Sequence, residues 1–100
     1  MAATTARLER RIRRDFPEPG AATGVLRLLA GLPQRAGYDG DVLASERVQA
    51  AVVLAARGNL ARLRQMLDLA IADWRDALVA AELADQDWQQ RLDIELGPQG

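Results

Sequence analysis

The sequence predicts an all-α fold: a compact bundle of five or six short helices that forms one domain over residues 1–100. Good helix formers dominate the chain, namely alanine, leucine, arginine, glutamine and glutamate. Apolar residues recur every third or fourth position, which is the period of an amphipathic helix. Aromatic residues make up only 4% of the chain and no stretch alternates apolar with polar side chains, so no strands are expected.

A proline-rich turn at residues 17–20 separates the first two predicted helices, which lie at about residues 3–15 and 21–31. Each proline removes a hydrogen-bond donor and biases the preceding residue away from helical angles. For the same reason we expect Pro33 to end the second helix. The apolar stripes that these helices would bury are Leu8, Ile12 and Phe16 in the first, and Val25, Leu28, Leu29 and Leu32 in the second.

The longest loop is expected at residues 33–41, and a third helix within residues 42–57. Ser45 suits the N-cap of this helix, although Asp41 would start it one turn earlier. A helix that is apolar on most sides is usually surrounded by other helices. We therefore expect the helix near residues 45–57 to be central. Its apolar stripe consists of Val48, Ala51, Val52 and Ala55, and Val53 and Leu54 add apolar bulk on other faces.

Gly58 and Asn59 form a short link to a fourth helix that begins near Leu60. Gly58 fits a left-handed helix end, and Asn59 suits an N-cap. So short a link makes the third and fourth helices antiparallel neighbours.

The end of the chain is expected to contain one or two more helices. The fourth helix either ends near residue 72 or continues, since Asp73 suits the N-cap of a separate helix at about residues 74–83. The last helix is expected at about residues 86–96, with Asp85 as its N-cap and the Gly-Pro pair at 97–98 as its stop signal.

The composition excludes several kinds of catalytic centre. The chain has no histidine, no cysteine and no lysine, and all 13 basic residues are arginine. It therefore lacks a thiol nucleophile, an imidazole base, the ligands of a Cys/His zinc site and a Schiff-base lysine. Carboxylate metal sites in helical bundles usually add a histidine, so we interpret the acidic residues of the C-terminal half as caps and solvated positions. We expect no enzyme, no cofactor and no bound metal.

Charge is unevenly distributed, although the formal net charge is only −1. Residues 1–14 carry five arginines and one glutamate, whereas residues 68–96 carry eight acidic residues and two arginines. These regions of opposite charge are expected to attract each other, either within one chain or between chains.

Four arginines of the first helix share one arc opposite its apolar stripe: Arg7, Arg10, Arg11 and Arg14. Such a face would suit phosphates or anionic lipid. However, nucleic-acid binders are usually basic and interleave basic with aromatic residues, whereas this chain is slightly acidic and shows no such interleaving. A solvated outer face is therefore our first interpretation of these arginines, and a contact with nucleic acid is the second.

Three aromatic residues are further candidates for binding. Trp74 and Trp88 are in register with apolar neighbours, so we expect them in the core, with an interface as the alternative because tryptophan is enriched there. Tyr38 lies in the predicted loop, and functional residues concentrate on loops, although a simple connector is the first interpretation.

The chain shows no sign of a membrane span or a secretion signal. Its longest uninterrupted apolar run covers residues 50–56, whereas a span needs about 20 residues. Residues 1–16 carry five arginines and lack the apolar core of a signal peptide. We therefore expect a cytoplasmic protein.

Two resemblances add to this interpretation. Residues 45–58 (SERVQAAVVLAARG), with the later DWRD at 73–76 and DW at 87–88, resemble small uncharacterised helical proteins from bacteria with GC-rich genomes. That resemblance covers residues 10–97 and implies no activity. Residues 48–55 and 74–81 are also similar to the alanine-rich inner helix of HEAT-type repeats, although they begin 26 residues apart instead of about 40. This second resemblance implies a protein-binding scaffold.

We therefore expect a non-enzymatic helical protein-interaction module from a bacterium, whose partner is another protein or a second copy in a homodimer. The alternative is a nucleic-acid-associated protein that uses the arginine-rich first helix. The candidate binding residues are Arg7, Arg10, Arg11, Arg14, Tyr38, Trp74 and Trp88.

Overall fold

The computed structural model describes residues 4–35 and 40–97, and these contain no strand, which confirms the predicted all-α class. Six of the helices in this part of the chain have seven residues or more, and the seventh is a single turn of four. In chain order they are α1 (Ala6–Asp15), α2 (Ala21–Arg35), α3 (Gly40–Leu43), α4 (Glu46–Ala56), α5 (Leu60–Ala72), α6 (Trp74–Ala80) and α7 (Trp88–Leu96).

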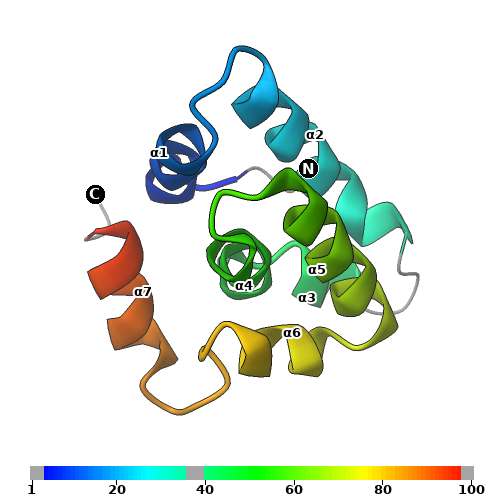
Figure 1. The fold of residues 1–100 in the computed structure, drawn as a ribbon. Helices are drawn as coiled ribbons and strands as arrows, with labels where there is room; N and C mark the ends of the chain where they lie inside the picture. Colours follow the sequence, from blue (N-terminus) through cyan, green and yellow to red (C-terminus); the bar gives the residue numbers. More distant parts are fainter. Residues whose placement is uncertain (1–3, 36–39, 98–100) are drawn as a thin grey trace.

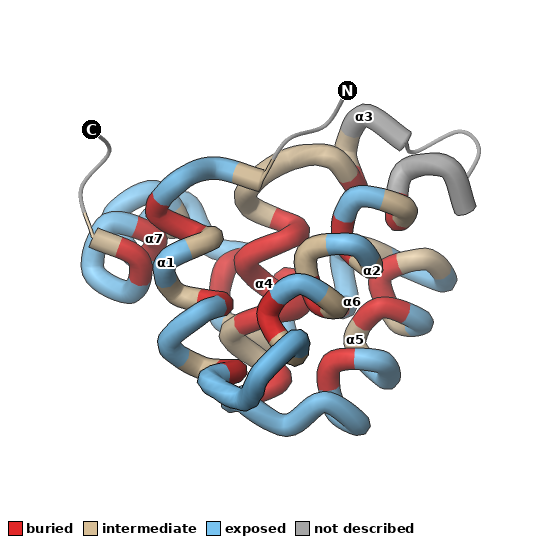
Figure 2. The backbone as a smooth tube through the Cα atoms, turned by 90° about the horizontal axis from the view of Figure 1, so that it is seen from above, coloured by how far each residue is buried: buried red, intermediate tan, exposed pale blue. Residues whose placement is uncertain are grey.

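Helix α4 runs through the middle of the bundle, as its apolar sequence predicts. Seven of its eleven residues are buried, and it packs against α1, α3, α5, α6 and α7. Figure 1 shows α4 nearly end-on, with α1, α2, α5, α6 and α7 arranged around it. In Figure 2 the buried positions follow the inner side of each surrounding helix and cover much of α4. The expectation of a central helix near residues 45–57 is confirmed.

Side-chain caps start four of the helices. Thr5, Ser45, Asn59 and Asp73 each accept a hydrogen bond from a backbone N–H in the first turn of the helix that follows. The predicted caps at Ser45, Asn59 and Asp73 are therefore confirmed. Thr5 was not predicted, and because it caps α1 this helix begins at Ala6 instead of near residue 3.

The expectation that Pro33 ends the second helix is wrong, since α2 continues to Arg35. Proline lacks only its own N–H, so near a helix end it removes one hydrogen bond while later N–H groups can still reach carbonyls one turn back. Residues 33–35 and 40–41 of the predicted loop at 33–41 are helical, and its residues 36–39 lie outside the described part of the chain.

The third predicted helix is divided into α3 and α4 at Ser45. The Ser45 hydroxyl donates a hydrogen bond to the carbonyl of Val42 at 2.6 Å and accepts one from the N–H of Val48 at 3.3 Å. One side chain thus closes the short helix and caps the central one. The start at Ser45 is that of the central helix α4. The turn before it is a separate short helix, α3, which begins at Gly40, one residue before the alternative start at Asp41.

The link between α4 and α5 uses two successive left-handed residues, Arg57 with φ 51° and Gly58 with φ 75°. A Cβ atom on Gly58 would lie 3.0 Å from the carbonyl oxygen of Asp15, at the end of α1. Glycine is therefore needed here both for its backbone angles and for the close approach of α1. The left-handed end predicted at Gly58 is confirmed.

Helix α6 ends in a Schellman motif at Ala80, three residues earlier than expected. The N–H of Leu83 donates to the carbonyl of Leu78 at 2.8 Å, and the N–H of Glu82 donates to the carbonyl of Val79 at 3.1 Å. Leu78 and Leu83 are both buried, which supplies the apolar contact that accompanies this motif. Glu82 occupies the left-handed position, with φ 60°.

Helix α7 begins at Trp88, so the prediction that Asp85 caps it is wrong. Asp87 occupies the N-cap position, but its backbone is not extended and its side chain makes no capping hydrogen bond. Asp85 instead uses its backbone carbonyl, which accepts from the N–H of Trp88 at 3.2 Å. Among the helices described, none is long and apolar enough to cross a membrane.

Candidate functional site

The four arginines of α1 do not form one solvated face, so that prediction is wrong. Arg7 is buried, with 6% of its side chain exposed. Its guanidinium forms a two-pronged contact with Glu46 at the start of α4, through Nε to Oε2 at 2.8 Å and Nη2 to Oε1 at 2.5 Å. Nη1 donates to a carboxylate oxygen of Asp93 at 2.6 Å and to the carbonyl of Gly97 at 3.0 Å. Arg7 thus joins α1, α4 and the end of α7.

The electrostatics of this cluster favour the charged forms of both partners. Hydrogen bonds from Arg7 lower the pKa of the Glu46 carboxyl below its usual value, against the opposing effect of burial. The pKa of Arg7 is raised, chiefly by the hydrogen bonds to Glu46 and Asp93. Arg7 and Glu46 therefore form an ion pair at neutral pH that joins α1 to α4.

Arg11 is also turned inward. Its Nε lies 3.0 Å from a carboxylate oxygen of Asp15, and its Nη1 donates to the backbone carbonyl of Glu95 at 2.8 Å. Arg10 and Arg14 are exposed and form no ion pair with any described residue. Helix α7 covers one side of the arc formed by the four arginines. Arg7 and Arg11 therefore bind residues of other helices, whereas Arg10 and Arg14 face solvent.

The two tryptophans are neither fully buried nor free. Trp74 and Trp88 are half-buried and pack against the core. The guanidinium of Arg47 lies 4.6 Å from the Trp88 ring centre, and that of Arg75 lies 4.8 Å from the Trp74 ring centre. Each exposed ring face is therefore already covered by a cation. The last aromatic candidate, Tyr38, lies outside the described residues.

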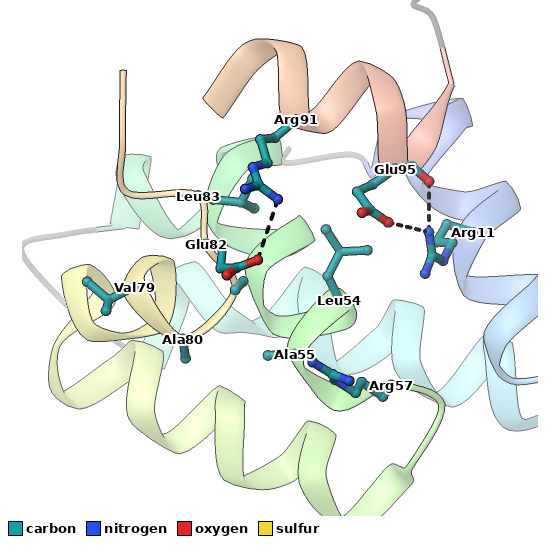
Figure 3. A pocket seen from close by; sticks show the side chains of 11 residues that line it. Arg11, Leu54, Ala55, Arg57, Val79, Ala80, Glu82, Leu83, Arg91 and Glu95 are labelled. Atoms are coloured by element: carbon teal, nitrogen blue, oxygen red, sulfur yellow. Dashed lines mark hydrogen bonds and ion pairs between the residues drawn. The ribbon is translucent and has the colours of Figure 1, made fainter. Parts of the chain in front are cut away.

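The candidate site is a groove of about 560 Å³ between the C-terminal ends of α4 and α6 and one side of α7. Leu54 projects into the middle of it (Figure 3), with Ala55 beside it on α4. Val79 and Ala80 line the side formed by α6. These residues form the floor of the groove, whose exposed lining is mostly polar. Leu54 is only half-buried, because it lies off the buried stripe of the central helix.

Two ion pairs flank this floor, as Figure 3 shows. On one side Arg91 lies 3.4 Å from a carboxylate oxygen of Glu82, and on the other Arg11 lies 3.3 Å from one of Glu95. A fifth charge, on Arg57, is exposed and has no ion-pair partner among the described residues. The rim therefore alternates positive and negative groups and leaves one cation unpaired.

The backbone is unusual at two points of the same groove. Within residues 4–35 and 40–97, only Arg57 and Glu82 combine a positive φ with a side chain. Each occupies a left-handed position at a helix end, where glycine is the usual residue. Left-handed angles in other residues cost about 1–3 kcal/mol and tend to occur at functional sites.

One exposed aliphatic side chain lines the groove, that of Val79 on α6, which is 64% exposed. Two other large hydrophobic residues in the described part of the chain are exposed. Ile94 on α7 is 79% exposed and does not line the groove, and Leu60 is 42% exposed and lies near the end of α1.

Sequence reasoning did not select the residues that carry this site. Of the predicted candidates, only Arg11 lines the groove, and Leu54, Arg57, Val79 and Glu82 were missed. One signal was present: Leu54 falls outside the apolar stripe of the central helix. The described residues contain no group of three side chains suited to hold a metal ion.

No family model, curated protein or solved structure matches the chain. The site is therefore interpreted from the chemistry of the groove alone.

Proposed function

We propose that the chain is a non-enzymatic helical interaction module that pairs with a second copy of itself through the groove between α4, α6 and α7. The observation that carries the proposal is a hollow that combines the half-buried Leu54, the exposed aliphatic side chain of Val79 and a rim of both charges. The non-enzymatic part is supported by the absence of histidine, cysteine and lysine from the sequence.

The aliphatic side chains favour association. Covering a residue of the size of Val79 contributes about 1.5–3 kcal/mol. Two copies bring two such side chains, on the order of 3–6 kcal/mol. This is comparable with the lower part of the 4–15 kcal/mol that association costs in lost freedom. The hollow beside Leu54 provides space for a projecting side chain of the other copy.

The charges favour a second copy over a strongly charged partner. In a two-fold dimer the same patch meets itself, so a rim of one sign would repel its own copy. The rim here has three arginines and two glutamates, which can face opposite charges across the axis. The net charge of −1 adds little repulsion between copies. A standard interface of about 800 Å² per partner would cover roughly an eighth of the 6152 Å² surface.

The experiment is sedimentation equilibrium of the purified chain and two matched variants over a range of concentrations. We expect the wild type to approach twice the chain mass of 10.9 kDa. Val79→Asp places a charge on the proposed interface and is expected to be monomeric. Leu60→Asp makes the same change at an exposed leucine away from the groove, and is expected to remain dimeric. A wild type that stays monomeric at its solubility limit would refute the proposal.

The alternative of a nucleic-acid-associated protein has less support. Arg7 and Arg11 are engaged by carboxylates of the same chain, which leaves Arg10 and Arg14 as the free cations of that arc. Binding to mixed DNA and RNA that weakens steeply with salt would favour this alternative. A bacterial setting belongs to our proposal and is supported by the use of arginine without lysine. A cytoplasmic location is part of the same proposal.

A further inference from the structure

The Glu82 carboxylate is held in place at the expense of stability. Glu82 occupies the left-handed position of the Schellman motif that ends α6, where glycine is the residue that adopts these angles without strain. The motif needs only the backbone of this residue, because its hydrogen bonds run between backbone atoms. Folding of α6 therefore gives no reason for a charged side chain at this position.

The ion pair within the chain does not supply that reason either. The Glu82 side chain is 74% exposed and lies 3.4 Å from Arg91, and exposed pairs of this kind contribute little to stability. Arg91 also lies 3.9 Å from a carboxylate oxygen of Asp87, the N-cap residue of α7. Glu82 can therefore leave Arg91 without leaving that arginine unpaired.

Arg57 presents the complementary case across the same groove. It too has left-handed angles, although Gly58 directly follows it, and its guanidinium has no ion-pair partner among the described residues. No ion pair recorded within the described chain joins Arg57 to Glu82. The groove therefore presents one free cation and one weakly held anion, each on a backbone position that would favour glycine.

We propose that Arg57 and Glu82 are the specificity-determining residues of the groove, each receiving the opposite charge of a second copy. This inference rests on the proposed function. Two-fold symmetry makes the contact reciprocal: if Arg57 of one copy meets Glu82 of the other, the second such pair forms as well. Arg57 and Glu82 then keep their strained backbone angles because their charges are needed for binding. Glycine at either position would give a chain at least as stable.

A charge exchange tests the pair directly. Arg57→Glu gives a chain with two anions at these positions, and Glu82→Arg gives a chain with two cations. We expect each variant alone to be monomeric, because each dimer would place like charges together. An equal mixture of the two is expected to restore a dimer that contains one chain of each kind, seen as a single intermediate mass in native mass spectrometry. Arg64→Glu and Glu18→Arg, at exposed positions outside the groove, are the controls and are expected to remain dimeric.

A stability measurement separates a binding role from a structural one. At concentrations where both chains are monomeric, so that dimerisation adds no stability, we expect Glu82→Gly to unfold at the same temperature as the wild type or a higher one. At higher concentration its dimer is expected to dissociate at least tenfold more readily. A lower unfolding temperature for the monomeric Glu82→Gly would overturn the inference. So would charge variants that remain dimeric, and in that case the dimer itself would still stand. A monomeric wild type would overturn both proposals.

Discussion

Replacing Arg7 with methionine is expected to be among the most damaging single changes in the chain. The side chain is 6% exposed and donates four hydrogen bonds, to Glu46, Asp93 and Gly97. Methionine fills much of the same space, so the change removes the cation while leaving most of the packing. Its effect therefore reports the electrostatic role of the cluster.

The magnitude depends mainly on the carboxylate that is left behind. Glu46 is only 14% exposed and would keep the Thr5 hydroxyl as its remaining side-chain donor. Asp93 is 59% exposed and would be solvated by water at little cost. Removing one partner of a buried pair typically costs about 3–5 kcal/mol. We expect a loss near 3 kcal/mol, because one of the two stranded carboxylates is well solvated, out of a total stability of about 5–15 kcal/mol.

Urea unfolding followed by circular dichroism measures this loss, with Arg14→Met as the exposed control, expected within about 0.5 kcal/mol of the wild type. The double variant Arg7→Met, Glu46→Leu removes both charges and is expected to recover most of the stability, as apolar replacements of buried pairs often do. A loss below about 1 kcal/mol for Arg7→Met would show that the cluster behaves as a surface pair, and would refute the reasoning.

Three further predictions concern stability. Gly58→Ala is expected to cost more than the roughly 1–2 kcal/mol of its left-handed angles alone, because its Cβ would lie 3.0 Å from the backbone oxygen of Asp15. Gly20 also has a positive φ but has open space around it, so the difference between the urea midpoints of Gly58→Ala and Gly20→Ala measures the cost of that close contact. Gln49→Met is expected to raise stability by about 1–2 kcal/mol, since the buried Nε2 of Gln49 has no hydrogen-bond partner; a lower melting temperature would contradict this. Because the pKa of Glu46 is lowered in the folded state, the unfolded chain binds that proton first and stability falls as pH drops below about 4.5. Unfolding curves at several pH values should show a smaller fall for Glu46→Gln, and an equal fall would exclude this carboxyl as the cause.

Local sequence signals predicted the helices well where a single residue controls the backbone. Ser45, Asn59 and Asp73 were identified as caps, and each accepts the expected hydrogen bond. Two predictions failed, that Pro33 ends the second helix and that Asp85 caps the last one. At both positions the backbone conformation depends on the neighbouring turns as well as on the residue itself. A proline in the last turn can be accommodated, and an aspartate caps a helix only when its own backbone is extended.

The site depended on contacts between residues far apart in the chain. Arg7 and Arg11 look like solvated residues from their spacing, but Asp93 and Glu95, more than 80 residues later, turn them inward. Leu54 was identified as apolar bulk outside the main stripe, yet its neighbours Val79 and Glu82 could not be inferred from it. Helical period shows which residues share a face, but not which helix will cover that face.

The sequence alone determined that this chain is all-α, has a central helix near residues 45–57 and contains no histidine, cysteine or lysine. These properties follow from composition and local period, which act over one or two helical turns. Tertiary structure decided which charges are buried, where the groove lies, and that Arg57 and Glu82 stand in left-handed positions beside it. The physical reason is that burial and ion pairing depend on how separate helices pack against each other, and packing joins residues that local sequence patterns treat as independent.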